Sequence, residues 1–308
     1  MASSDLQAPE SAASPDYLLH LEGVHKRYPT KPSGEKTVLN NIGLRVRKGE
    51  LISVVGPSGC GKSTLLRMVL GSEQPSEGTL LIDGETVSGP SRERGIVFQK
   101  YSLFPHLSVR DNIVFGLDLE EFSIPSRLLR YPHYRKRKRH YAEKAQTFLE
   151  RMQLGEAGDK FPHQLSGGMR QRVAIAQAAI MEPRILMMDE PFGALDDATR
   201  QEMQLFLLEL WEKSEMTIFF VTHDLEEALF LGSRILVLSQ YYAANDSLGG
   251  AKIVTDKEVP GGHPKPSDFK YSSEFSELLA QIRRDGLDPE SRQHVEDFDL
   301  SHRDAWTG

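Results

Sequence analysis

A short glycine-rich stretch carries the clearest chemistry in this 308-residue sequence. It follows an apolar run at 51–55 and fits the pattern G-x-x-x-x-G-K-[ST], reading Gly56-Pro57-Ser58-Gly59-Cys60-Gly61-Lys62-Ser63-Thr64. The glycines let successive backbone N–H groups face an anion, and the helix expected from Thr64 points its positive end at the same place. In such a cradle Lys62 reaches the β- and γ-phosphates of a nucleotide, and the Ser63 hydroxyl binds Mg²⁺. A plain turn is the alternative, but the strand before and the helix after favour phosphate binding.

Two adjacent carboxylates, Asp189 and Glu190, end the apolar run that begins at Ile185. Such a run is typical of a parallel strand covered on both faces, and ligands gather at the carboxyl ends of these strands. We therefore predict that Asp189 holds magnesium through its water shell and that Glu190 polarises an attacking water. A helix N-cap is the alternative, and the preceding phosphate cradle makes it the weaker one.

Two further polar residues stand at the ends of apolar runs. Gln99 closes the expected strand at 95–99 and is a candidate to bind Mg²⁺ or orient a water, although most such glutamines cap a loop. His223 follows the run at 217–222, where an imidazole can donate a hydrogen bond to a γ-phosphate. Taken alone, such a histidine is more often structural.

A second anion site is predicted at the start of another helix. Ser166, Gly167 and Gly168 precede the helical run at 173–181, where free N–H groups and the helix dipole attract negative charge. A capped helix needs only the serine, so the double glycine favours contact with a ligand.

Three features of the sequence each have two interpretations. Tyr28 stacks on an adenine or is a surface tyrosine beside a turn, and the pattern does not decide between them. Cys60 is a redox-sensitive thiol or, as we favour, a small filler of the cradle. The basic run at 131–140 clamps nucleic acid or anionic lipid, or is the solvated start of a helix, which the acidic remainder of the chain favours.

The elements that must position these residues alternate between strands and helices. Residues 1–16 are rich in Ala, Ser and Pro and are expected to be a disordered leader. Strands are expected at 18–24, 37–39, 42–46, 51–55, 78–84, 95–99, 185–189, 217–222 and 234–238, and residues 251–254 with 257–260 are expected to extend the sheet. Helices are expected at 64–70, 109–154 with an interruption, 173–181, 198–213 and 272–284, followed by a polar tail.

Composition limits the class of protein. With 39% hydrophobic residues the chain can bury a full core, while a net charge of −7 argues against general nucleic-acid binding. A lone cysteine excludes a disulfide framework and fits a reducing compartment. No apolar stretch approaches the roughly 18–20 residues that cross a bilayer, and Met1–Asp5 lacks the plan of a secretory signal. We expect a chain that is soluble by itself, with any membrane role exerted through a partner.

The order of these motifs resembles the nucleotide-binding subunit of ATP-binding cassette (ABC) transporters over residues 18–284. By that resemblance residues 56–64 are the Walker A loop, Gln99 is the Q-loop glutamine, and residues 165–169 are the family signature. Asp189 and Glu190 become the Walker B pair, Asp196 lies in the D-loop, His223 is the switch histidine and Tyr28 stacks on adenine. The sequence around 165–172, 188–196 and 272–275 looks most like that of the importers of nitrate, sulfonate, taurine or related small solutes.

The resemblance implies an α/β P-loop NTPase fold with a RecA-like core sheet, an antiparallel β-subdomain and an α-helical subdomain. The implied domain is 17–260, with the helical subdomain at about 100–180 and a C-terminal helix and tail at 261–308. It implies hydrolysis of ATP with Mg²⁺ between two head-to-tail copies, or one copy and a homologous ATPase subunit. Ser166 and Gly168 of one copy then cover the ATP held by Lys62 of the other. The implied partners are membrane-spanning permease subunits and, indirectly, a substrate-binding protein, with no specific nucleic acid, at the cytoplasmic face of the inner membrane.

This sequence departs from the family pattern at three places. Signature position five is usually Gln and is Met169 here, the segment 119–139 is longer than usual, and the loop 241–250 is expanded. Two other functions use the same phosphate cradle. A soluble ATPase of the same superfamily acting on nucleic acid or the ribosome has only the basic run in its favour. A P-loop kinase acting on a metabolite leaves the signature without a purpose.

Overall fold

The computed structural model describes residues 17–32, 34–99, 102–121, 131–243, 249–262, 265–266 and 269–307, with backbone alone for 131–135. The predicted leader at 1–16 lies outside these residues, as do the central parts of the segment 119–139 and the loop 241–250. Among the described residues, no helix combines the length and the apolar composition needed to cross a membrane.

The core is a six-stranded sheet within this described part of the chain. In spatial order its strands are β11 (Lys252–Glu258), β9 (Arg234–Ser239), β3 (Leu51–Val55), β8 (Thr217–Val221), β7 (Ile185–Asp189) and β6 (Arg94–Val97). All neighbours are parallel except β11, which runs antiparallel to β9. The prediction that 251–254 and 257–260 extend the sheet is confirmed, and the two stretches belong to one strand, β11.

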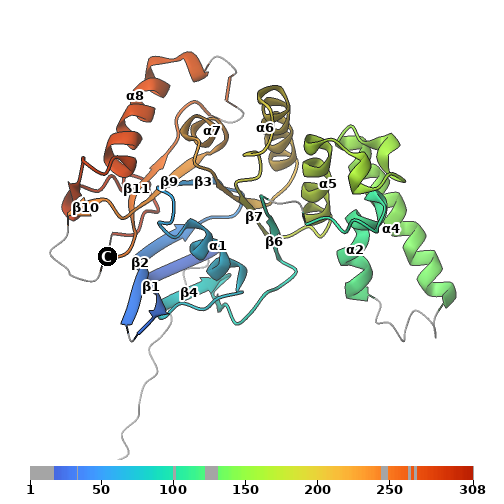
Figure 1. The fold of residues 1–308 in the computed structure, drawn as a ribbon, viewed down its shortest axis with the longest axis horizontal. Helices are drawn as coiled ribbons and strands as arrows, with labels where there is room; N and C mark the ends of the chain where they lie inside the picture. The colour runs from blue at the N-terminus through green and yellow to red at the C-terminus, as the bar shows by residue number, and fades with distance from the viewer. Residues whose placement is uncertain are drawn as a thin grey trace, which may run out of the picture.

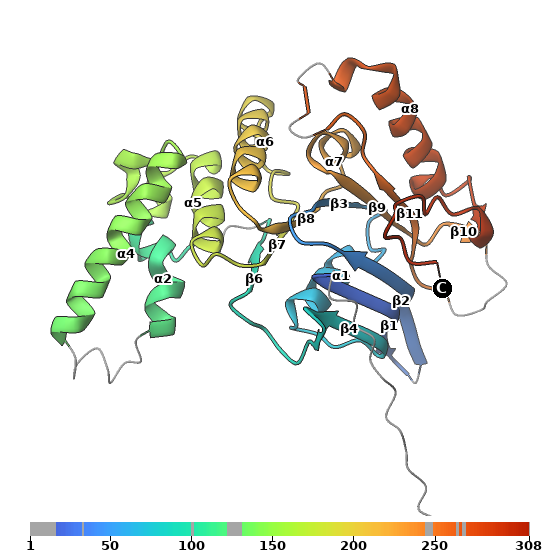
Figure 2. The ribbon, with the colours of Figure 1, turned by 180° about the vertical axis from the view of Figure 1, so that it is seen from behind.

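Both faces of this sheet are buried, which explains its unbroken apolar runs. Along β8, Phe219 and Val221 face one hydrophobic cluster, whereas Ile218 and Phe220 face another. This alternation follows from the twofold period of a strand. Helices α7 and α8 cover one face, and α1 with an antiparallel sheet covers the other (Figures 1 and 2).

The helices are α1 (Lys62–Leu70), α2 (Val109–Glu121), α4 (Tyr131–Arg151), α5 (Gly167–Ala179), α6 (Asp197–Glu212), α7 (Leu225–Leu231) and α8 (Ser273–Ile282). Short elements are the 3₁₀ turns Gly155–Ala157, Pro162–Gln164, Phe269–Tyr271 and Val295–Asp297, the π-helical turn Arg283–Leu287, and the strands β10 (Tyr242–Ala243) and β12 (Gln293–His294). The expected helix at 272–284 is confirmed as α8, whose N-cap Ser272 accepts a hydrogen bond from the Phe275 N–H at 3.1 Å.

The antiparallel sheet orders β2 (Gly34–Val46), β1 (Leu19–Thr30), β4 (Glu77–Ile82) and β5 (Glu85–Thr86). The prediction of two separate strands at 37–39 and 42–46 is wrong, because β2 continues through both. Its register against β1 shifts beside Asn41, which has a φ of 52° and donates its N–H to His25 Nδ1 at 3.3 Å. A bulge of this kind inserts a residue without ending the strand.

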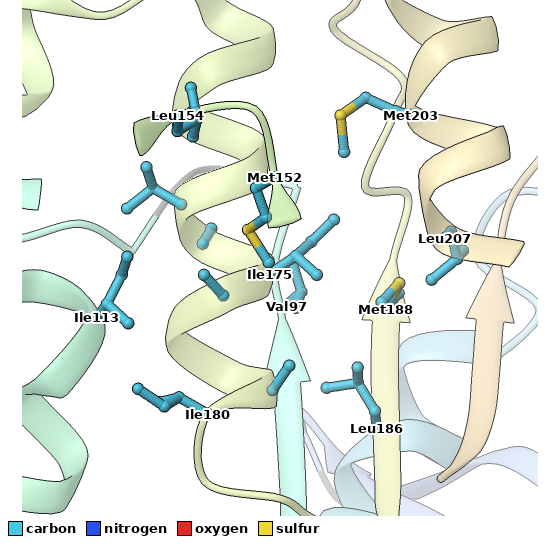
Figure 3. Close-up of a cluster of buried hydrophobic side chains, with 14 of the residues drawn as sticks. Val97, Ile113, Met152, Leu154, Ile175, Ile180, Leu186, Met188, Met203 and Leu207 are labelled. Atoms are coloured by element: carbon cyan, nitrogen blue, oxygen red, sulfur yellow. The ribbon is translucent and has the colours of Figure 1, made fainter. Parts of the chain in front are cut away.

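The helical part joins the core through one hydrophobic cluster. Figure 3 shows Ile113 of α2 and Ile175 of α5 in the same cluster as Val97 of β6, Met188 of β7 and Leu207 of α6. A displacement of α2 or α5 therefore reaches the strands that carry the predicted catalytic residues, since closely packed interiors transmit strain.

Three of the described side chains of the basic run are paired with acids. Arg137 Nε lies 2.7 Å from Glu121, Lys138 Nζ lies 3.5 Å from Asp111, and Arg139 Nε lies 3.4 Å from Glu143 in the next turn. The run lies in α4, so its described part matches the solvated-helix interpretation.

Candidate functional site

The glycine-rich loop joins β3 to α1 as a cradle. Gly61 is the N-cap of α1 with a φ of 109°, a conformation that L side chains rarely adopt. The Lys62 ammonium lies within the loop and donates to the carbonyls of Gly56 at 2.7 Å and Pro57 at 3.0 Å. Ser58 and Gly59 are exposed at the tip. The loop thus holds a cation and the start of a helix at one place, which is the chemistry that a phosphate chain requires.

Cys60 behaves as a filler of this loop. Its side chain is buried in the hydrophobic cluster that joins the antiparallel sheet to α1. Burial raises the pKa of the Cys60 thiol, so the reactive thiolate is disfavoured at neutral pH. The geometry supports the filler interpretation over the redox one.

Residues from three adjacent strand ends meet beside the cradle. Ser63 Oγ donates to Asp189 Oδ2 at 3.0 Å, which joins the first turn of α1 to the end of β7. Glu190 Oε2 lies 3.4 Å from both Gln99 Nε2 and His223 Nδ1, which follow β6 and β8. Gln99 does not close its strand as predicted, because β6 ends at Val97. Gln99 lies two residues beyond that end, with its side-chain amide beside Glu190.

The backbone of Glu190 is strained. Its φ of 47° is uncommon for a residue with a side chain, and its N–H donates to the Val221 carbonyl at 2.9 Å. Such a conformation costs about 1–3 kcal/mol and persists where the surroundings impose it, most often at active sites. Here it turns the chain after β7 so that Asp189 meets Ser63 while Glu190 meets the glutamine and the histidine.

The donors at this edge suit a hard divalent cation shared with phosphates. Ser63 and Asp189 supply two neighbouring oxygens. Within the described ranges, no group of three or more His, Cys, Asp and Glu side chains is arranged to hold a metal ion. This pattern fits magnesium, which is usually bound through one or two protein oxygens together with water and substrate phosphates.

The signature residues lie in another part of the chain. Ser166 is the N-cap of α5, and its Oγ accepts the Met169 N–H at 3.3 Å, with Gly167 and Gly168 in the first turn. Figures 1 and 2 place β6 and β7 between α5 and α1, so the structure does not bring Ser166 to Lys62. Asp196 caps α6 and accepts from the Thr199 N–H at 3.0 Å, a hydrogen bond that lowers the pKa of Asp196.

Gly168 also has a packing role that the sequence did not suggest. A Cβ at this position would lie 2.3 Å from Thr199 Cγ2, so α5 approaches α6 so closely that a larger residue would have to displace the Thr199 side chain. The double glycine therefore cannot be attributed to ligand contact alone.

Tyr28 lies on β1, half-buried, and its hydroxyl donates to Glu73 in the connection after α1. The role of Glu73 could not be predicted from the sequence, because nothing in the local pattern links it to a tyrosine 45 residues away.

A second missed group supports the turn that carries His223. Glu227 is buried, accepts from Thr222 Oγ1 at 2.7 Å and from Gln204 Nε2 at 3.0 Å, and burial raises the pKa of its carboxyl. Thr222 Oγ1 in turn accepts the Asp224 N–H at 3.1 Å. In the sequence Glu227 reads only as an acid in the first turn of a helix, which gives no sign of burial.

Comparisons with known proteins find similar sequences and similar structures. The ABC transporter family model matches residues 39–193. The chain is 40% identical over 251 residues to the nitrate import ATP-binding protein of Synechocystis sp., covering 80% of this chain and 89% of the relative. It is 37% identical over 267 residues to an aliphatic sulfonates import ATP-binding protein of Bacillus cereus, covering 87% of this chain and 96% of the relative. A dimeric ATP-binding cassette in a post-hydrolysis state, bound to ADP and Pi, matches over 79% of this chain and 100% of its own, with a TM-score of 0.63 and 28% identity.

Proposed function

Because the chain belongs to the ABC transporter family, we propose that it is the ATP-hydrolysing subunit of an importer of a small solute of the nitrate or sulfonate class. The observation that carries the proposal is the junction of Ser63, Asp189, Glu190, Gln99 and His223 beside the loop that holds Lys62. This set combines a phosphate-binding cation, magnesium-type oxygens and a carboxylate next to two hydrogen-bonding side chains.

In the proposed reaction the cradle binds the phosphate chain and Lys62 exchanges its two loop carbonyls for phosphate oxygens. Bound magnesium, held by Ser63 and Asp189, would neutralise charge on the β- and γ-phosphates. Glu190 orients the attacking water and accepts its proton. Gln99 and His223, both already within 3.4 Å of Glu190, fix that carboxylate and sense the γ-phosphate.

One chain supplies half of a closed site. Ser166, Gly167 and Gly168 lie at the start of α5, and β6 and β7 separate α5 from α1, the helix that follows the cradle (Figure 1). We therefore infer that a second copy brings these residues, together with Asp196 at the start of α6, to the nucleotide. The dimeric cassettes among the solved structures support this arrangement. Bound ATP then joins the two copies, and loss of the γ-phosphate lets them part.

The relatives named for import support membrane permease subunits as partners and a peripheral position on the cytoplasmic face. The helical part is the proposed transmitter, because its hydrophobic cluster is continuous with β6 and β7. A substrate-binding protein on the other side of the membrane completes the proposed system. The paired basic residues of α4 give a nucleic-acid function no support.

Replacing Glu190 by Gln tests the proposal directly. The variant should lose steady-state release of phosphate while it still binds ATP, because the amide preserves the shape but cannot accept a proton. Release of phosphate at the wild-type rate would refute the role given to Glu190. Lys62→Ala serves as the companion variant and should lose ATP binding itself.

A further inference from the structure

Three charged side chains, Lys26, Arg67 and Glu73, surround Tyr28. We call these four residues the Tyr28 cluster. The Glu73 carboxylate is its centre, because it accepts from the Tyr28 hydroxyl and from Arg67 Nε at 2.6 Å and lies 3.4 Å from Lys26 Nζ. Although partial burial opposes it, the hydrogen bonds from Tyr28 and Arg67 lower the pKa of Glu73. Glu73 is therefore a charged acceptor at neutral pH, and such hydrogen bonds are the strong ones.

Lys26 also defines which face of the ring a base can use. Lys26 and Tyr28 are two residues apart on β1 and share one side of the strand. The Lys26 ammonium lies 5.1 Å from the ring centroid and donates to the Gln74 carbonyl at 2.8 Å. A cation over one face favours the ring electrostatically, and a flat base would stack on the opposite face.

Arg67 connects this cluster to the phosphate cradle. Its Nη2 donates to Thr64 Oγ1 at 3.1 Å, one turn earlier on α1, and lies 3.5 Å from the Tyr28 hydroxyl. Thr64 is the last residue of the cradle and is buried. The Arg67 guanidinium thus contacts both the loop predicted to hold the phosphates and the tyrosine predicted to hold the base. These two contacts fix the distance between the loop and the tyrosine.

We propose that Glu73 and Arg67 are positioning residues that hold the Tyr28 ring at a fixed distance from the phosphate cradle, ready to stack the purine of a nucleoside triphosphate. This inference rests on the proposed function, because it assumes that the cradle binds a nucleotide. The pair acts on affinity rather than on turnover, since neither side chain lies at the junction around Glu190. Ordering one free aromatic side chain on binding weakens affinity by about threefold to tenfold, which is the effect expected when the anchor is removed.

The experiment compares a ligand with a base to one without. The full-length chain is titrated, with Mg²⁺ present, by displacement of a fluorescent ATP analogue with either ATP or inorganic tripolyphosphate. The variants are Tyr28→Phe, which keeps the ring, Glu73→Ala, their double variant, and Tyr28→Ala. Glu77→Gln is the matched control. It removes an acid on β4 that pairs at 2.8 Å with Arg27, the neighbour of Tyr28 on β1. Thermal unfolding of each variant verifies that it is folded.

The expected result is that Tyr28→Phe and Glu73→Ala each weaken ATP binding by about threefold to tenfold, that the double variant is no weaker than the single ones, and that tripolyphosphate binding is unchanged. Glu73→Gln, which keeps an acceptor for the hydroxyl, should recover part of the loss. Two outcomes overturn the inference while leaving the proposed function intact: weakening by Tyr28→Ala alone, or equal weakening of ATP and tripolyphosphate by Glu73→Ala. If Lys62→Ala binds ATP as the parent does, the proposed function itself fails.

Discussion

The C-terminal segment, expected from sequence to be a polar tail, is fastened to the core by a nearly buried carboxylate. Asp304 is 3% exposed and accepts from Arg47 Nε at 2.7 Å, Arg47 Nη2 at 2.8 Å and the Tyr17 hydroxyl at 3.0 Å. The same segment places the Trp306 ring against Gly43, where a Cβ would lie 1.9 Å from the ring. We predict that Asp304→Asn destabilises the whole domain and does not merely free an end.

The magnitude follows from the titration of Asp304. The hydrogen bonds from Arg47 lower the pKa of its carboxyl from 3.8 to about 2. At 1.36 kcal/mol per pKa unit this difference corresponds to about 2 kcal/mol of stability at neutral pH. Arg47 is 37% exposed, so screening by solvent brings the expected loss to about 1–2 kcal/mol.

The pH dependence has a definite sign. Because the folded pKa of Asp304 is below its unfolded value, the contribution is complete above about pH 4–5 and is lost as the pH falls toward 2. At pH 3 about half of it should remain. Urea unfolding from pH 7 down to pH 3 measures this, and urea is preferred to guanidinium because it does not screen charges. Asp297→Asn, an exposed aspartate of the same segment, is the control and should change stability by less than about 0.5 kcal/mol. A loss that is equal at every pH, or no loss at pH 7, would refute the reasoning.

Three further predictions concern the site. Gly168→Ala should lower the free energy of unfolding by about 1–3 kcal/mol because its Cβ meets Thr199, whereas Gly155→Ala, with 3.5 Å of clearance, should cost little; chemical denaturation measures both. Ser166→Ala should cost about 1 kcal/mol through the lost N-cap, and should also lower ATPase activity while single-chain ATP binding is retained; an unchanged rate counts against the composite site. Cys60 should react with a thiol reagent at pH 8 only after denaturation, and rapid labelling of the folded chain would contradict its burial.

The features that could be predicted from the sequence either lie within a short stretch of chain or follow from the rule that parallel strands end at the same edge of a sheet. The cradle, the apolar strands and their polar ends lie within short stretches whose chemistry is visible in order, and parallel strands bring Asp189, Gln99 and His223 to the same edge. The bulge at Asn41 was missed because asparagines there look like the end of a strand. A left-handed residue that donates a hydrogen bond to the neighbouring strand continues the strand instead.

The remaining features depend on pairs far apart in the chain. Asp304 and Arg47 are 257 residues apart, and Glu73 and Tyr28 are 45 apart, so no local periodicity relates them. Burial of Glu227 depends likewise on the packing of α7 against α6 through Gln204. Such contacts decide which exposed-looking polar residues become structural, and only the folded chain reveals them.

The central claim is that ATP joins two copies of this chain and that its hydrolysis separates them. Light scattering on Glu190→Gln with and without Mg²⁺–ATP tests it most directly, because this variant should hold the nucleotide without consuming it. The predicted result is a particle of twice the mass with ATP that returns to a single copy with ADP. A variant that binds ATP tightly and yet keeps the same mass under all three conditions would contradict the account.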